Sequence, residues 1–227
     1  MKTMDIEQLL KKRRSVRKFR ATSVPKADVA QILEFARLAP SGANLQPGKF
    51  HVRTNGALDN LKSTLLNAVA EGRPQVSQYS YFPDPMPANL KAKQRAAGYA
   101  LYSALGIERR DIRGRKDQFK QNYRFFDAPV GIVVTIHRDM GKGGFMDLGM
   151  AIMALFLSAE AKGYATTGIG ALASYGDLVH ATLGLPDDEL VVCGIALGVA
   201  AESEPVNQFR TDRDALNTYS SFDGFDD

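Results

Sequence analysis

The chain of 227 residues has no tryptophan and a single cysteine. One cysteine excludes an internal disulfide and is consistent with a reducing cytoplasm. Cys193 lies in the apolar run ELVVCGIALG, which predicts a small core residue instead of a nucleophile. The sequence also lacks a Walker loop, a serine-nucleophile motif and a cluster of metal ligands. We therefore predict that its chemistry, if any, depends on a bound organic cofactor.

Long apolar runs are scarce as well. We find no stretch of about 18 apolar residues, so no membrane span is expected. The first residues, MKTMDIEQLLKK, have no apolar core and predict an amphipathic helix, not a signal peptide. A hydrophobic fraction of 44% with 24% charged residues is ordinary for a globular domain. We expect a soluble, cytoplasmic protein with one well-formed core.

Positive charge is concentrated in one place. The net charge is +4, and the segment 11–20, KKRRSVRKFR, carries seven positive charges. By charge alone this run fits a nucleic-acid or nuclear-localisation patch or a solvated helix face as well as it fits an anion site. The overall excess is small and lacks interleaved aromatic residues, which disfavours nucleic acid as a partner.

The hydrophobic pattern predicts an α+β fold. Separated β-branched runs indicate strands, and apolar residues at helical spacing indicate helices between them. A turn-rich and then basic segment over about 71–124 predicts a helical excursion or lid within one domain, 1–227. We expect helices at 5–14, 28–38, 58–69, 90–105, 147–161 and 175–183, and strands at 49–53, 130–136, 164–169 and 189–197.

Five segments together resemble the FMN-dependent nitroreductase family, in its order and spacing. They are RRSVRKF (13–19), APSGANLQP (39–47), GYATTGIGALASY (163–175), LGLPDDELVVCGIALG (183–198) and NQFRTDR (207–213). The resemblance covers nearly the whole chain, and the segment around YFPDPMP is most similar to the nitrobenzoate-reductase branch. Each motif is weak by itself, but five in the right order are specific.

The resemblance implies a central mixed β-sheet wrapped by helices and an intertwined homodimer with FMN at the dimer interface. It implies ping-pong hydride transfer from NADPH or NADH, through the flavin, to a small, flat, electron-poor acceptor such as a nitroaromatic or a quinone. No side chain is then catalytic and no metal is needed, because the cofactor carries the redox chemistry.

The first group of site residues implied by the resemblance is cationic. Arg13, with Arg14 and Ser15, would bind the phosphate and ribityl oxygens of FMN, since the planar guanidinium group binds oxygens bidentately. Arg17 would lie at the pyrimidine edge and stabilise negative charge on the reduced flavin. A cation from the C-terminal segment would return to the phosphate; the spacing favours Arg213, and Arg210 is the alternative.

The second group comprises loops. Pro40, Ser41, Gly42 and Asn44 match the loop that the partner chain places against the flavin. Ile169 and Gly170 match a turn whose backbone N–H groups face the flavin N5 and O4. Other branches have Glu or Gln where this chain has Ile169, so only a backbone role transfers. Gly48 stands where many relatives have an aromatic residue.

Other functions stay open at this stage. The same fold could support enone reduction, dehalogenation or flavin breakdown, and a closed acceptor slot would leave a non-catalytic flavin-binding sensor. The sequence does not choose between NADH and NADPH, because many cations between residues 109 and 124 could contact a 2′-phosphate. It does not identify the physiological acceptor either.

Overall fold

Four strands pair into one antiparallel sheet in the order β1-β2-β4-β3. The structure, a computed structural model, describes residues 5–225, so the ends of the predicted 1–227 domain lie outside the described residues. The strands are β1 (Lys49–Thr54), β2 (Val130–His137), β3 (Ala165–Ile169) and β4 (Glu189–Gly198). All four were predicted from the sequence, with small differences at their ends.

The expected mixed sheet is corrected in one respect. Every pairing between the four named strands is antiparallel, and within residues 5–225 parallel pairing is limited to isolated bridges of Ser15 with Thr166 and Val76 with Tyr175. Strand direction depends on how the chain returns to the sheet, and the apolar pattern of a buried strand is the same in either direction.

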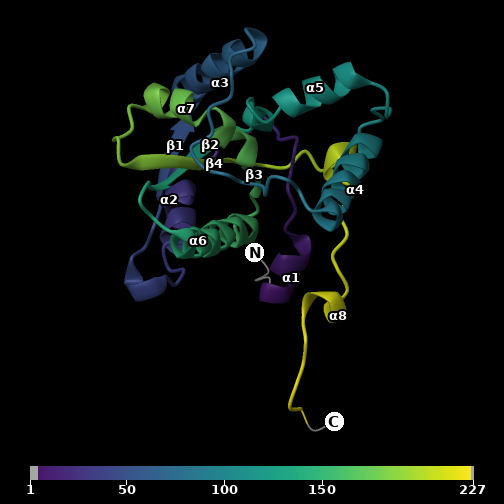
Figure 1. Cartoon of the computed structure of the whole chain (residues 1–227). Coiled ribbons are helices and arrows are strands. Elements are labelled where there is room, and N and C mark those ends of the chain that lie inside the picture. The colour runs from purple at the N-terminus through teal and green to yellow at the C-terminus, as the bar shows by residue number, and fades with distance from the viewer. Residues whose placement is uncertain (1–4, 226–227) are drawn as a thin grey trace.

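Helices cover both faces of the sheet (Figure 1). Alternate residues of β2 point to opposite faces, as the period of two in a strand requires. Ile132 and Val134 belong to the core shared with α2 (Lys26–Ala36) and α6 (Lys142–Ala161). Val133 belongs to the core beneath α3 (Asn55–Ala70) and α7 (Gly176–Leu183). The central strands β2 and β4 are therefore buried on both faces, which explains their continuous apolar runs.

The predicted excursion is helical and exposed. It contains α4 (Ala88–Ala104) and α5 (Ile112–Lys120), and neither helix has a buried residue. An ion pair between Lys93 of α4 and Asp214 joins this region to the C-terminal segment. The function of this excursion as a lid stays a prediction.

Within residues 5–225 one helix, α6, is long and apolar enough to cross a membrane by length and composition. A helix was predicted at 147–161, but no membrane span was expected there, and charged residues such as Asp147 and Glu160 interrupt the apolar run. In the fold α6 packs against α2 and β3, and its Leu148 and Leu155 are buried. It is a central helix of the fold, as predicted, although much of its apolar surface is exposed in the single chain.

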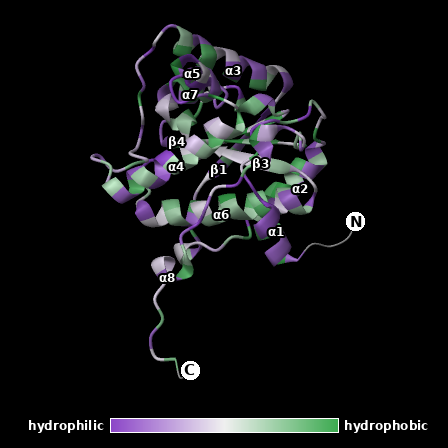
Figure 2. Cartoon of the chain, turned by 90° about the vertical axis from the view of Figure 1, so that its right-hand side faces the viewer, coloured by the Kyte–Doolittle hydropathy of each residue, from purple (hydrophilic) through white to green (hydrophobic). Residues whose placement is uncertain are grey.

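The two ends of the described chain differ in packing. The N-terminal helix α1 (Ile6–Lys12) packs against α6. After a turn at Pro205–Asn207, the C-terminal segment with α8 (Leu216–Tyr219) leads away from the rest of the molecule in both views (Figure 1, Figure 2). The large side chains of its outer part, Tyr219, Phe222 and Phe225, are 82%, 67% and 73% exposed.

Candidate active site

After Lys12, where α1 ends, the basic segment is extended and meets β3 at Ser15 and Val16. Val16 and Phe19 are buried in the core and fix its position. The backbone N–H of Val16 donates to the carbonyl oxygen of Thr166 at 3.1 Å, beside the bridge from Ser15. Because Val16 points inward, its neighbours Ser15 and Arg17 are directed toward the surface and are half-buried.

Asn207 joins this segment to the C-terminal one. It is 1% exposed, and its Oδ1 accepts a hydrogen bond from the backbone N–H of Arg17 at 2.8 Å. Its Nδ2 donates to the carbonyl oxygens of Lys18 at 2.8 Å and Ala201 at 2.9 Å. A buried amide with all these partners satisfied holds the two segments in register. Asn207 begins the NQFRTDR segment, and its structural role was not predicted from the sequence.

An arginine pocket follows from this arrangement. Its volume is about 310 Å³, and Arg13, Arg14, Ser15, Arg17, Arg210 and Arg213 all line it. Burial together with the nearby Arg213 and Arg210 lowers the pKa of Arg13, and burial lowers the pKa of Arg17. The effect on Arg13 shows cations crowded where an anion would relieve their repulsion, whereas the effect on Arg17 reflects burial alone. All six predicted cationic-site residues therefore converge.

Both arginines of the C-terminal segment line the arginine pocket. The Nη2 atom of Arg210 donates to the carbonyl oxygen of Lys12 at 3.2 Å, and Nη1 of Arg213 donates to Oγ1 of Thr211 at 2.9 Å. The spacing in the sequence favoured Arg213 over Arg210, whereas in the structure both residues line the pocket. Phe209, which was not predicted, lies under Arg17, with 5.9 Å from Cζ to the ring centroid.

A larger cavity opens at the end of β3. It has a volume of about 810 Å³, and Ile169, Gly170 and several aromatic side chains line it. Ile169 is 1% exposed, so its side chain is part of the core. Cys193 also borders this cavity, and burial raises the pKa of its thiol to about 12. The thiol is therefore protonated at neutral pH, in agreement with its predicted role as a core residue.

The predicted partner-facing loop has a strained backbone. Ala43, Asn44 and Gln46 have φ values of 49°, 55° and 49°, a region that non-glycine residues rarely adopt. Two hydrogen bonds hold it: the N–H of Gln46 donates to Oγ of Ser41 at 2.9 Å, and the N–H of Gly42 donates to Oδ2 of Asp147 at 3.0 Å. Gln46 thus helps to order the loop.

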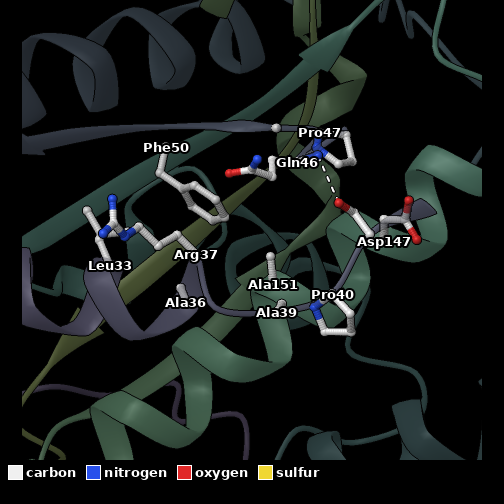
Figure 3. Close-up of a pocket in the computed structure, with 12 residues that line it drawn as sticks. Leu33, Ala36, Arg37, Ala39, Pro40, Gln46, Pro47, Phe50, Asp147 and Ala151 are labelled. Atoms are coloured by element: carbon white, nitrogen blue, oxygen red, sulfur yellow. Dashed lines mark hydrogen bonds between the residues drawn. The ribbon is translucent and has the colours of Figure 1, made fainter. Parts of the chain in front are cut away.

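A small pocket lies behind this loop (Figure 3). Its volume is about 210 Å³, and it is bordered by Leu33 of α2, by Arg37 just after that helix, by Pro40 and Phe50, and by Asp147 of α6. Asp147 was not predicted as a site residue. An acidic residue in a helix gives no sign in the sequence that it will accept a hydrogen bond from a distant backbone N–H.

Gly48 ends the loop for a steric reason. Its φ is 102°, and a Cβ at this position would lie 2.5 Å from Cδ1 of Leu148. A side chain here would force the Leu148 side chain to shift and would strain the backbone at this positive φ. The absence of a side chain at Gly48 is therefore matched by the close approach of Leu148 on α6.

In one copy of the chain the predicted residues form three separate groups. The arginine pocket, the β3 cavity and the loop pocket share no lining residue. Pro40, Ser41, Gly42 and Asn44 border neither of the first two. Among residues 5–225, no group of three His, Cys, Asp or Glu side chains is placed to hold a metal ion.

Comparison with known proteins identifies the class. Residues 10–199 match the sequence model of the Nitroreductase family, and the chain belongs to this family. It is 32% identical to 4-nitrobenzoate reductase of Pseudomonas putida, over 99% of this chain and 98% of that protein. It is 33% identical to chloronitrobenzene nitroreductase of Comamonas testosteroni, over 96% of each chain.

Solved structures agree with this assignment. The FMN and NADPH-dependent nitroreductase NfnB from Sphigopyxis sp. strain HMH superposes with a TM-score of 0.95 at 35% identity, covering 98% of this chain and 100% of that one. The FMN-dependent nitroreductase NfnB from Mycobacterium smegmatis, in complex with NADPH, gives 0.91 at 30% identity, covering 96% and 97%. The nitroreductase-like α+β fold expected from the sequence is thereby confirmed, whereas the homodimer stays a prediction.

Proposed function

We propose that this protein is an FMN-dependent NAD(P)H oxidoreductase that reduces nitroaromatic or quinone-like acceptors. The observation that carries the proposal is that Arg13, Arg17, Arg210 and Arg213 line one pocket. Ser15, in the same pocket, pairs with Thr166 of β3. The end of β3 opens into a large cavity lined by aromatic side chains. Membership of the nitroreductase family and the likeness to FMN- and NADPH-dependent enzymes support it.

The arginine pocket suits a phosphate group. Arg13, Arg210 and Arg213 are assigned to the phosphate oxygens of FMN, and Arg14 and Ser15 to the phosphate or ribityl oxygens. Guanidinium groups form two parallel hydrogen bonds with such oxygens. The lowered pKa of Arg13 next to two other arginines supports an anionic occupant, because an anion would offset that repulsion.

The remaining cofactor contacts are assigned along β3. Arg17 lies deeper than the exposed Arg210, and its positive charge would stabilise negative charge at the pyrimidine edge of the flavin. Ile169 and Gly170 would present backbone N–H groups to the ring. Bound FMN supplies the redox chemistry by accepting hydride from NAD(P)H and passing it to the acceptor, and the protein supplies position and charge.

A homodimer completes the site in this proposal. Pro40, Ser41, Gly42 and Asn44 border neither the arginine pocket nor the β3 cavity of their own chain. Their loop keeps a strained backbone, which is typical of functional contacts. We assign this loop to the flavin bound by a second copy. The exposed apolar surface of α6 and the outward C-terminal segment support an extensive contact between copies.

The acceptor and the cell compartment follow from the same features. The β3 cavity is lined by Tyr79, Tyr81 and Phe145, whose rings favour flat aromatic compounds. We assign α4 and α5 as a lid over one side of the site, without nucleic acid or membrane as a partner. A single buried cysteine is consistent with the cytoplasm as its location.

A spectroscopic titration tests the proposal. The protein is purified, reconstituted with FMN and mixed anaerobically with NADPH or NADH, and then with 4-nitrobenzoate. We expect yellow protein that loses its visible absorption with the nucleotide and regains it when the acceptor is added. A protein that takes up no FMN, or that is not reduced by either nucleotide, would overturn the proposal.

A further inference from the structure

The edge of the β3 cavity contains a β-bulge. In the pairing of β2 with β4, Val134 lies opposite Cys193 and Thr135 lies opposite Val191, so Val192 has no partner on β2. The pairing of β3 with β4 ends at Ile169 and Gly194. Val192 and Cys193 both border the cavity. A bulge of this kind redirects side chains and is frequent beside active sites.

Two side chains from one distant segment satisfy the backbone at this bulge. The Oε1 atom of Gln78 accepts a hydrogen bond from the N–H of Val191 at 2.8 Å. The hydroxyl of Tyr79 donates to the carbonyl oxygen of Val192 at 2.7 Å. Buried backbone groups left without a partner are costly, so these two bonds attach the segment around Gln78 and Tyr79 to the sheet.

The attached segment provides the aromatic wall of the cavity. The Tyr79 ring lies 5.4 Å from that of Phe145 on α6 and 6.3 Å from that of Tyr81. Tyr81 in turn covers Gly170, since a Cβ at Gly170 would lie 3.3 Å from the Tyr81 ring. Beyond this point the side chains of Tyr81 and Phe82 are 62% and 56% exposed. The firm attachment of the wall is therefore at Gln78 and Tyr79.

We propose that Gln78 and Tyr79 are positioning residues that fix the width of the acceptor cavity by clamping its aromatic wall to the bulge of β4. The inference rests on the proposed function, because it takes this cavity as the acceptor site. With the clamp closed, Tyr81 is held over Gly170, and the slot prefers a single flat ring. With the clamp loosened, the wall moves outward and bulkier acceptors are tolerated.

The tyrosine hydroxyl is committed to this structural bond. It donates its proton to the carbonyl oxygen of Val192, and burial raises the pKa of Tyr79 well above its ordinary value. Tyr79 therefore offers its ring, and not its proton, to an acceptor. Gly176 has a related part: a Cβ there would lie 3.0 Å from Oε1 of Gln78, so its lack of a side chain leaves room for the clamp.

Three variants loosen the clamp in different ways. Tyr79→Phe removes one hydroxyl and keeps the ring, and Gln78→Leu removes the acceptor oxygen at similar volume. Gly176→Ala pushes Gln78 away without changing any residue that lines the cavity. The matched control is Tyr164→Phe, which removes a hydroxyl bonded to Oδ2 of Asp28 at 2.6 Å and lies outside the cavity lining.

Each FMN-loaded variant is assayed with nitrobenzene and with 1-nitronaphthalene, and hydrogen exchange is measured on peptides covering residues 76–87. We expect the KM for nitrobenzene to rise about three- to tenfold, the range that corresponds to one lost hydrogen bond. Preference for the single ring over the double ring should fall. Exchange in 76–87 should accelerate in all three variants, while Tyr164→Phe should behave as the wild type in both measurements.

Three results would overturn the inference alone. The first is unchanged hydrogen exchange in the variants, and the second is an unchanged ratio of activity between the two acceptors. The third is an equal loss of rate in every step together with a loss of thermal stability. If the wild type is reduced by NADPH but transfers nothing to either nitroarene, the acceptor assignment and this inference fail together. The exchange measurement still reports whether the clamp exists, so the two failures are distinguishable.

Discussion

The Oδ2 atom of Asp147 accepts a hydrogen bond of 3.0 Å from the backbone N–H of Gly42 and so ties the strained loop to α6. Asp147→Ala should release the loop and weaken FMN binding, because this loop is the proposed contact from the second copy. A hydrogen bond to a charged group contributes about 1.5–3 kcal/mol, so we expect roughly a tenfold or greater rise in the Kd for FMN. Fluorescence titration of FMN measures it. Asp147→Asn keeps an acceptor oxygen and should retain most of the affinity; equal losses in both variants would contradict the assignment.

The phosphate assignment is tested by removing two arginines. The double variant Arg13→Ala with Arg213→Ala should purify colourless, with a Kd for FMN raised about 100-fold or more, because each lost charge-assisted bond costs about 1.5–3 kcal/mol. The matched control is Arg20→Ala, from the same basic run but outside the arginine pocket, and it should stay yellow. A fully yellow double variant would show that the phosphate binds elsewhere.

The position of Lys142 in the β3 cavity leads us to expect a preference for acidic acceptors. Among the residues that line the β3 cavity it is the one with a charged side chain. Lys142→Gln should lower kcat/KM for 4-nitrobenzoate about three- to fivefold, which is the size expected for one solvent-exposed charge pair. The value for nitrobenzene, which has no carboxylate, should not change. A parallel fall for both compounds would show that Lys142 does not recognise the carboxylate.

We expect Glu189 to make the folded protein less stable in acid. It is 4% exposed and accepts hydrogen bonds from Lys49, from Oγ1 of Thr135 at 2.7 Å and from Nε2 of His51 at 2.9 Å. Burial by itself would raise its pKa, but these donors outweigh burial and hold the pKa of Glu189 below its ordinary value. A carboxylate with a lowered folded pKa stabilises the protein above its unfolded pKa, and that contribution is lost as pH falls through the folded pKa.

The free energy of unfolding of the wild type should therefore fall as pH drops from about 5 to 3. Glu189→Gln should be less stable at neutral pH and should show a shallower fall over this interval. Urea unfolding at several pH values measures both slopes. Identical slopes would show that Glu189 does not control the acid response.

Tyr123 carries a buried hydroxyl without a partner among the described residues. Burial and the neighbouring Tyr175 raise the pKa of Tyr123 to about 12, so the group stays protonated. Tyr123→Phe should raise the free energy of unfolding by about 1 kcal/mol, because an unsatisfied buried polar group is destabilising. The edge-to-face contact with Tyr175, 5.3 Å between centroids, is kept. Denaturant unfolding at pH 7 measures it, and a clear loss of stability would contradict the prediction.

The local pattern of the sequence determined the elements of the fold. The β-branched runs of β2 and β4 and the helical spacing of apolar residues in α2 and α3 are local signals, and they predicted these elements within a few residues. The five ordered motifs identified the family, and with it the expectation that Arg13, Arg17 and Gly170 belong to a flavin site. Each of these inferences depends on neighbours in the chain or on the order of motifs.

The tertiary structure decided how distant segments meet. It placed both Arg210 and Arg213 beside Arg13, and it showed that Asn207 makes this possible across 190 positions of sequence. It also showed the bulge at Val192 with the clamp from Gln78 and Tyr79. Such contacts depend on the packing of whole elements, and an Asn or Gln in the sequence carries no mark of the backbone group that it will meet. The mixed sheet implied by the family resemblance was wrong for the four named strands. The apolar pattern could not have corrected it, because a buried strand has the same pattern in parallel and antiparallel pairing.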